Sequence, residues 1–126
     1  MKTAATSVLS LGLLIASAAA QSGAGTLFNF VPGLGACGFT NTSDQFVASV
    51  SNTTFHSFPG AGANPNANPI CTHNLTVSFN GTNVTAQIVD FAVGVPAENV
   101  GFSPAAFSEF ADTSQGIVQN VTWVIS

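Results

Sequence analysis

The sequence predicts an all-β domain, a small closed or nearly closed β-barrel with one short helix. Short segments of alternating apolar and polar residues follow one another, each bounded by Gly, Pro, Asn or Ser. Only one segment has helical spacing, and no linker to another domain stands out. Several short strands joined by turn-rich connections are typical of such a barrel.

Five segments have the alternation expected of strands: residues 25–31, 45–51, 74–79, 84–90 and 120–125. Residues 80–83, Asn-Gly-Thr-Asn, predict a hairpin turn between the third and the fourth. In each of the last four segments, alternate residues share one face of the strand. These residues are, in chain order, Phe46, Ala48 and Val50; Leu75, Val77 and Phe79; Val84, Ala86, Ile88 and Asp90; and Val121, Trp123 and Ile125. We expect the set of residues 75–79 to point inward and Trp123 to pack inside the barrel.

The helix is expected over residues 103–112. Ser103 is a suitable N-cap, and Pro104 fits the first helical turn. Phe107, Phe110 and Ala111 then form an apolar stripe at helical spacing, which we assign to the core.

The first twenty residues predict a secretory signal peptide. Lys2 precedes the apolar run VLSLGLLIASAAA, and Ala18 and Ala20 stand in small-x-small order before Gln21. The alternative is a membrane anchor, but the run is too short to span a bilayer. We therefore expect residues 21–126 to form one barrel domain, secreted to the extracellular space or cell wall and not bound to a membrane.

Charge excludes several classes of partner. Lys2 is the only Lys or Arg, against five Asp and Glu residues. Without Lys2, the chain has no strong cation with which to neutralise a run of phosphates. Nucleic acid and anionic lipid are therefore poor partners, whereas neutral glycans and protein surfaces remain possible.

Two residue types indicate an extracellular environment. Cys37 and Cys71, the only cysteines, are expected to form a disulfide in a secreted chain. A metal site built on Cys71 and His73 is the alternative, but a second ligand pair is missing, so we predict no metal. Six of the eleven asparagines begin N-x-[ST] sequons and are predicted N-glycosylation sites: Asn41, Asn52, Asn74, Asn80, Asn83 and Asn120.

Several motifs resemble a known family. The segments GLGACGFTNTSDQFVASVS, FPG, NPNANPIC, VDF, FSPAAFSEFAD and GIVQNVTW occur in the order found in fungal expansin-like proteins. These proteins are related to barwin and to rare-lipoprotein-A-like domains. The resemblance covers residues 21–126 and implies a six-stranded double-psi β-barrel. The second, carbohydrate-binding domain of full expansins is not expected here.

The resemblance also implies a site. Thr26 and Phe28 match the family's G-x-x-T-x-Y/F opening, which lines the barrel groove, and Asp90 matches its first acid. The structural alternative remains open, since Phe28 is equally suited to the core. Gly101 replaces the second acid, the expected proton donor of lytic relatives, and glycosidic hydrolysis needs an acid with a base or nucleophile. We therefore predict no enzymatic activity.

The leading hypothesis is a secreted, monomeric, non-catalytic protein that binds or loosens a neutral cell-wall polysaccharide such as cellulose, chitin or glucan. A second hypothesis is a protein-binding module, similar to barrels that resemble protease inhibitors or defence and effector proteins. Its natural contact element would be the Pro- and Asn-rich loop over residues 58–69. A third hypothesis is a weak enzyme with its acid relocated to Glu98. Some fungal sequences of this pattern carry an oxidative name, but no flavin site or other cofactor site is evident.

Overall fold

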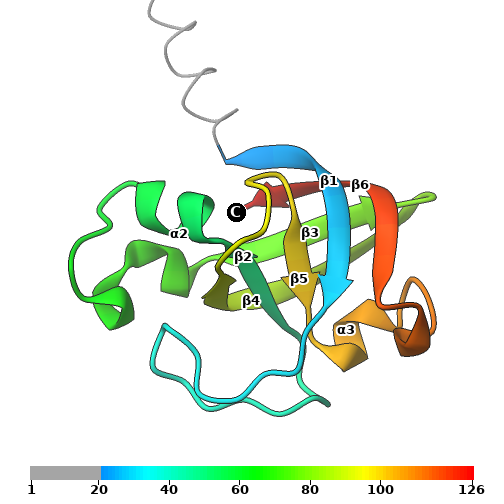
Figure 1. Ribbon diagram of the computed structural model, residues 1–126, viewed down its shortest axis with the longest axis horizontal. Coiled ribbons are helices and arrows are strands. Elements are labelled where there is room, and N and C mark those ends of the chain that lie inside the picture. The colour runs from blue at the N-terminus through cyan, green and yellow to red at the C-terminus, as the bar shows by residue number, and fades with distance from the viewer. Residues whose placement is uncertain (1–20) are drawn as a thin grey trace, which may run out of the picture.

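The computed structural model describes residues 21–126, which form a closed barrel (Figure 1). The strands are β1 (Ser22–Asn29), β2 (Val47–Ser51), β3 (Asn74–Phe79), β4 (Thr82–Ala92), β5 (Val100–Phe102) and β6 (Ile117–Ile125). The helices are α2 (Asn52–Ser57) and α3 (Pro104–Phe107), with 3₁₀ turns η1 (Pro65–Ala67), η2 (Pro69–Thr72) and η3 (Thr113–Gln115). The predicted signal peptide, residues 1–20, lies outside the described residues.

The strand order around the barrel is β1-β5-β2-β4-β3-β6, with β6 closing onto β1. The pairs β1–β5 and β2–β4 are parallel, and the remaining pairs are antiparallel. This is the predicted all-β, six-stranded double-psi β-barrel. The connection from β1 to β2, residues 30–46, crosses the outside of the barrel below the strands in Figure 1.

The inward faces of β3, β4 and β6 follow the predicted alternation, except that a bulge at Val89 turns Asp90 away from the face on which it was predicted with Ile88. Their buried residues are Leu75, Val77, Val84, Ala86, Ile88, Val121, Trp123 and Ile125. Phe79 is partly buried and contacts Phe110 edge to face, with ring centroids 6.2 Å apart. Burying each large aliphatic side chain contributes about 1.5–3 kcal/mol, so this alternation is the main source of barrel stability.

The predicted hairpin is present between β3 and β4. Phe79 pairs with Thr82, and the two turn residues, Asn80 and Gly81, have φ values of 50° and 79°. A two-residue type I′ turn requires positive φ at both positions, which Asn and Gly adopt most readily. The Asn-Gly prediction is confirmed.

The prediction for residues 45–51 is wrong in part. All five residues of β2 are buried, and Phe46, expected on the same face as Ala48 and Val50, lies before the strand and is 43% exposed. β2 lies between β4 and β5, and both of its faces are covered. A strand buried on both faces has no polar side, so alternation is a poor guide to its orientation.

The structure contains two short helices, α2 in addition to the predicted one. Helix α2 follows β2 directly, because the Ser51 hydroxyl accepts the Thr54 N–H at 3.0 Å and caps its first turn. Helix α3 starts at Pro104 as predicted, but it ends at Phe107 and gives way to a turn. Ser103 precedes it with its hydroxyl engaged elsewhere, donating to the Gln45 carbonyl and accepting the Val47 N–H.

Within residues 21–126, no helix combines the length and the apolar character needed to cross a membrane.

Candidate functional site

Sheet register aligns four residues across the outer side of the barrel. Phe28 on β1 pairs with Gly101 on β5, Gly101 pairs with Ser49 on β2, and Ser49 pairs with Asp90 on β4. Paired residues on adjacent strands point to the same face of a sheet. We call Phe28, Gly101, Ser49 and Asp90 the outer row. It contains two of the three predicted groove residues and the glycine that replaces the second acid.

The ring of Phe28 covers Gly101. A Cβ atom at residue 101 would lie 2.3 Å from Cε1 and 2.7 Å from Cζ of Phe28. Such separations lie far inside van der Waals contact, so a side chain at residue 101 requires the ring to move. The position of the missing acid is therefore filled by an aromatic ring.

Asp90 is placed by a β-bulge and is engaged by backbone amides. The register between β2 and β4 shifts between Ala48 and Ser49, which leaves Val89 unpaired and turns Asp90 outward. Asp90 Oδ1 accepts the N–H of Phe91 at 2.8 Å and the N–H of Ala36 at 3.1 Å. Asp90 thus holds the connection between β1 and β2 against the barrel.

Thr26 faces a different part of the surface. It lies at a register shift between Gly25 and Leu27, and its N–H donates to Asn99 Oδ1 at 3.2 Å. With Ala24 and Gln119, it borders a shallow depression between β1 and β6. The structure therefore places Phe28 and Asp90 on one row and Thr26 beside it, toward β6.

Glu98 and Trp123 meet through the backbone. Glu98 is exposed, as its position between Pro96 and Asn99 predicts, and its carbonyl accepts the indole N–H of Trp123 at 2.8 Å. Trp123 is only 5% exposed and packs against Gly23, which confirms that it lies inside. Among residues 21–126, no group of three or more His, Cys, Asp or Glu is arranged to hold a metal ion.

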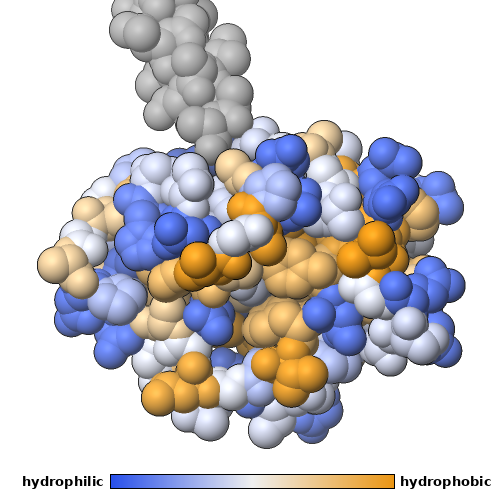
Figure 2. Space-filling model, in the orientation of Figure 1, coloured by the Kyte–Doolittle hydropathy of each residue, from blue (hydrophilic) through white to orange (hydrophobic). Residues whose placement is uncertain are grey.

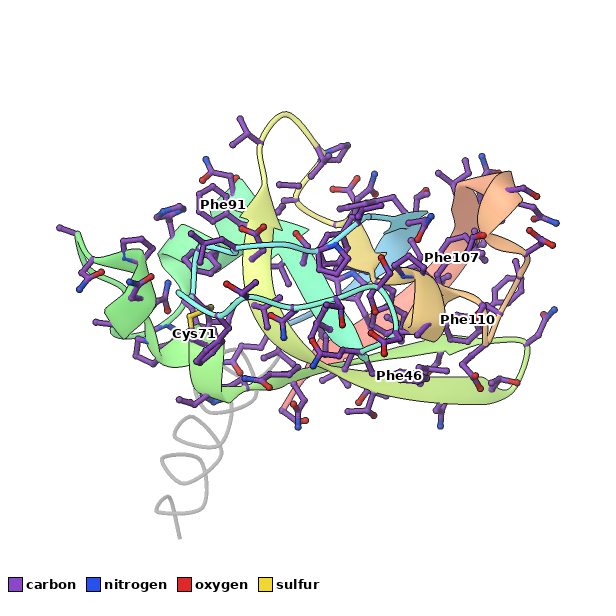
Figure 3. All side chains as sticks on the ribbon, turned by 90° about the horizontal axis from the view of Figure 1, so that it is seen from below. Phe46, Cys71, Phe91, Phe107 and Phe110 are labelled. Carbon is purple, nitrogen blue, oxygen red and sulfur yellow. A yellow bond between two sulfur atoms is a disulfide. The ribbon has the colours of Figure 1, made fainter. Side chains whose placement is uncertain are left out.

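Residues 30–41, which we call the anchored loop, were not predicted from the sequence as a contact element. The loop is fixed by the Cys37–Cys71 disulfide, which confirms the predicted pairing and is visible in Figure 3. The Cys37 N–H also donates to the Val89 carbonyl at 3.1 Å. The loop nevertheless exposes Val31 and Leu34, at 76% and 75%. The available signal was two aliphatic residues in a Pro- and Gly-rich turn, V-P-G-L-G.

The loop over residues 58–69 was predicted as a protein contact element. It is held from within by a buried asparagine and exposes no large apolar side chain. Buried Asn68 donates to the Phe55 carbonyl at 2.8 Å and accepts the Ile70 N–H at 2.9 Å. Its exposed residues are small or polar, and none is a large hydrophobic one. Figure 2 instead shows apolar side chains over the β1–β2 connection and over the β4–β5 segment, with a hollow between them.

Five of the six sequon asparagines are exposed. Asn74, Asn80, Asn83 and Asn120 lie on β3, β4, β6 or their hairpin, and Asn52 begins α2. Asn41 is partly buried, and its Nδ2 donates to Gln45 Oε1 at 3.0 Å. Glycosylation of these sites remains a prediction.

Comparison with known proteins reveals two kinds of similar barrel. No family model matches the chain. A papain inhibitor of Streptomyces mobaraensis is 31% identical over 61 residues, which are 48% of this chain and 43% of that protein. The aligned part is thus less than half of that relative.

Solved structures extend the match. The Streptomyces papain inhibitor superimposes with a TM-score of 0.74 at 25% identity, covering 83% of this chain and 94% of that one. An expansin of Clavibacter michiganensis in complex with cellohexaose gives 0.63 at 21% identity, covering 83% of this chain and half of that one. The apo expansin gives 0.64 at 18% identity, with the same coverage. The expected resemblance is thereby confirmed at the level of the double-psi barrel.

Proposed function

We propose that this chain is a secreted, monomeric, glycosylated protein-binding module that inhibits a papain-like cysteine protease. The papain inhibitor match supports this proposal because it spans nearly the whole of that solved chain, whereas only half of the expansin is covered. The observation that carries the proposal is the covered outer row. Because the Phe28 ring covers Gly101, the row has no room for a second acid, which favours a binding protein over one that performs chemistry on a sugar.

Two features of the outer row support a non-catalytic protein. Phe28 occupies the space in which an acid at residue 101 would stand. Asp90 is engaged through Oδ1 by two backbone amides, so it acts as an anchor in the folded chain. Glycosidic hydrolysis requires two carboxyl groups at a defined separation, and Gly101 supplies none.

The indole ring is also unsuited to a sugar platform. Carbohydrate stacking requires an exposed flat ring, whereas Trp123 is buried and its N–H is already bonded to Glu98. The chain contains no Tyr.

The test is titration of papain with the secreted, glycosylated protein. Residual protease activity is followed with a fluorogenic peptide, and complex formation is followed by calorimetry. Stoichiometric inhibition with an inhibition constant below about 1 μM is expected. A chain that neither inhibits nor binds papain or related cysteine proteases at about 10 μM would contradict the proposal.

Binding of a neutral polysaccharide is the second candidate. It is favoured by the partly exposed Phe28 ring and by Asp90, which stand at the two ends of the outer row, in a barrel whose fold is shared with an expansin crystallised with cellohexaose. The test is depletion of the protein by insoluble cellulose, chitin and β-glucan. Loss of depletion in Phe28→Ala and in Asp90→Asn, which preserves the anchoring oxygen, would place a glycan on the row. Release of reducing sugars that either substitution abolishes would instead indicate an enzyme.

A further inference from the structure

We propose that the anchored loop, residues 30–41, is the element that docks onto the partner, and that the partner presents an apolar cleft with a basic rim. This inference rests on the proposed function and identifies its contact surface. It replaces the loop of residues 58–69 as the expected contact element.

The first argument is the concentration of exposed apolar surface on this loop. Of the seven large hydrophobic residues exposed within residues 21–126, Val31, Leu34 and Phe39 all belong to it. Val31 and Leu34 are three-quarters exposed, so they contribute little to the packing of the barrel. Contiguous exposed apolar groups on a monomeric domain mark interaction sites.

The second argument is that the loop is held in one conformation before any partner arrives. The Ala36 N–H is bonded to Asp90, and the disulfide ties Cys37 to Cys71. Within the loop, the Gly35 N–H donates to the Phe39 carbonyl at 3.0 Å. A fixed loop loses little conformational entropy on binding, which raises affinity without new contacts.

A third feature shows how closely the loop is fitted to the barrel. A Cβ atom at Gly35 would lie 2.5 Å from the Val89 carbonyl oxygen and 3.3 Å from Asp90 Cβ. Glycine is therefore required where the loop backbone meets β4. The exposed Leu34 therefore precedes a residue, Gly35, whose backbone is in direct contact with β4.

The chemistry of the partner follows from what the loop offers. Two aliphatic side chains projecting from a rigid turn match a cleft with apolar walls. An exposed carboxylate, that of Asp44, follows three residues after the end of the loop. A hydrogen bond from the Thr42 hydroxyl lowers the pKa of Asp44, so it is ionised at neutral pH. Since the described residues include no Lys or Arg, a basic rim is the complementary charge.

The experiment uses papain as the probe. The double variant Val31→Thr/Leu34→Ser is compared with Val124→Thr, an exposed valine on β6, and with Pro59→Ala/Asn64→Ala in the loop of residues 58–69. The loop variant should raise the inhibition constant about 30-fold or more, whereas the two controls stay within about twofold. Circular dichroism and urea midpoints confirm that each variant is folded.

Two further measurements test the rigid loop and the charged rim. Amide hydrogen exchange of the free protein should protect Ala36 and Cys37 as strongly as strand amides. The association rate should fall several-fold as ionic strength rises from about 0.05 to 0.3 M. Rapid exchange would refute the fixed loop, and a salt-independent rate would refute the basic rim.

The outcomes separate the two proposals. Inhibition by the wild-type chain that survives Val31→Thr/Leu34→Ser within about threefold overturns the docking surface and leaves the proposed function intact. A wild-type chain that binds neither papain nor a related protease overturns the proposed function and the partner inferred from it. Loss of inhibition confined to the loop variant supports both.

Discussion

Replacing Gly101 with alanine is expected to destabilise the barrel, although alanine is ordinarily the better residue within a strand. The new Cβ would stand 2.3 Å from Phe28 Cε1, about 1.1 Å short of the 3.4 Å at which ordinary contact begins. This shortfall exceeds the few tenths of an ångström by which neighbouring atoms can move, so the Phe28 ring must rotate away from residue 101. Overpacking of this kind costs about 1–3 kcal/mol. The reduced backbone entropy of alanine offsets about 0.5–1 kcal/mol.

The assay is urea unfolding followed by circular dichroism. With a slope of about 1–1.5 kcal/mol/M, the midpoint of Gly101→Ala should fall by about 1 M. In a Phe28→Ala background the same substitution should cost nothing, because the obstructing ring is gone. Gly62→Ala, where a Cβ meets no atom within 4 Å, is the control and should leave the midpoint unchanged. A Gly101→Ala protein as stable as wild type would refute the idea that Phe28 closes the site.

Three other perturbations are expected to have defined effects. Cys37→Ser/Cys71→Ser opens a crosslink with a sequence separation of 34 and should lower the free energy of unfolding by about 3–4 kcal/mol; an unchanged urea midpoint would contradict this. Asp90→Ala should cost about 1–2 kcal/mol and speed amide exchange at Ala36, whereas Asp90→Asn retains the accepting oxygen and most of the stability; equal exchange in both variants would argue against anchoring. Hydrogen bonding from the Ser114 backbone lowers the pKa of Asp112 in the folded state, so its stabilising effect is present above the unfolded pKa and is lost as pH falls through the folded one. Urea midpoints should therefore decline less on acidification in Asp112→Asn than in wild type, and parallel pH profiles would exclude this contribution.

The sequence predicted the parts of the fold that local chemistry determines. Asn80 and Gly81 adopt the positive φ values that their turn requires, and the alternation of β6 places Trp123 inside. The sequence-based prediction failed where burial depends on contacts with distant parts of the chain. β2 is buried on both faces, so the alternation of residues 45–51 misplaced Phe46, and the cap by which Ser51 at the end of this strand starts α2 was not anticipated.

The candidate site was predictable only as a set of positions. Family resemblance identified Phe28, Asp90 and the missing acid at Gly101, but not that the Phe28 ring covers this glycine. The bond from Ala36 to Asp90 joins residues 54 positions apart, and the bulge at Val89 lies between strands about forty residues apart in the chain. No local pattern encodes such a contact, so the anchored loop became visible only in three dimensions.

Closure of the barrel restricts how any protein can bind to it. Each described strand has a hydrogen-bonded neighbour on both sides, and β6 seals the circle by pairing with β1 and β3. A partner therefore finds no strand with one whole edge open, whereas adding a strand to an open sheet edge is a common mode of peptide capture. The same closure removes the template for edge-to-edge aggregation. Recognition must pass through side chains, so a few substitutions in connecting segments can change the partner while the scaffold persists.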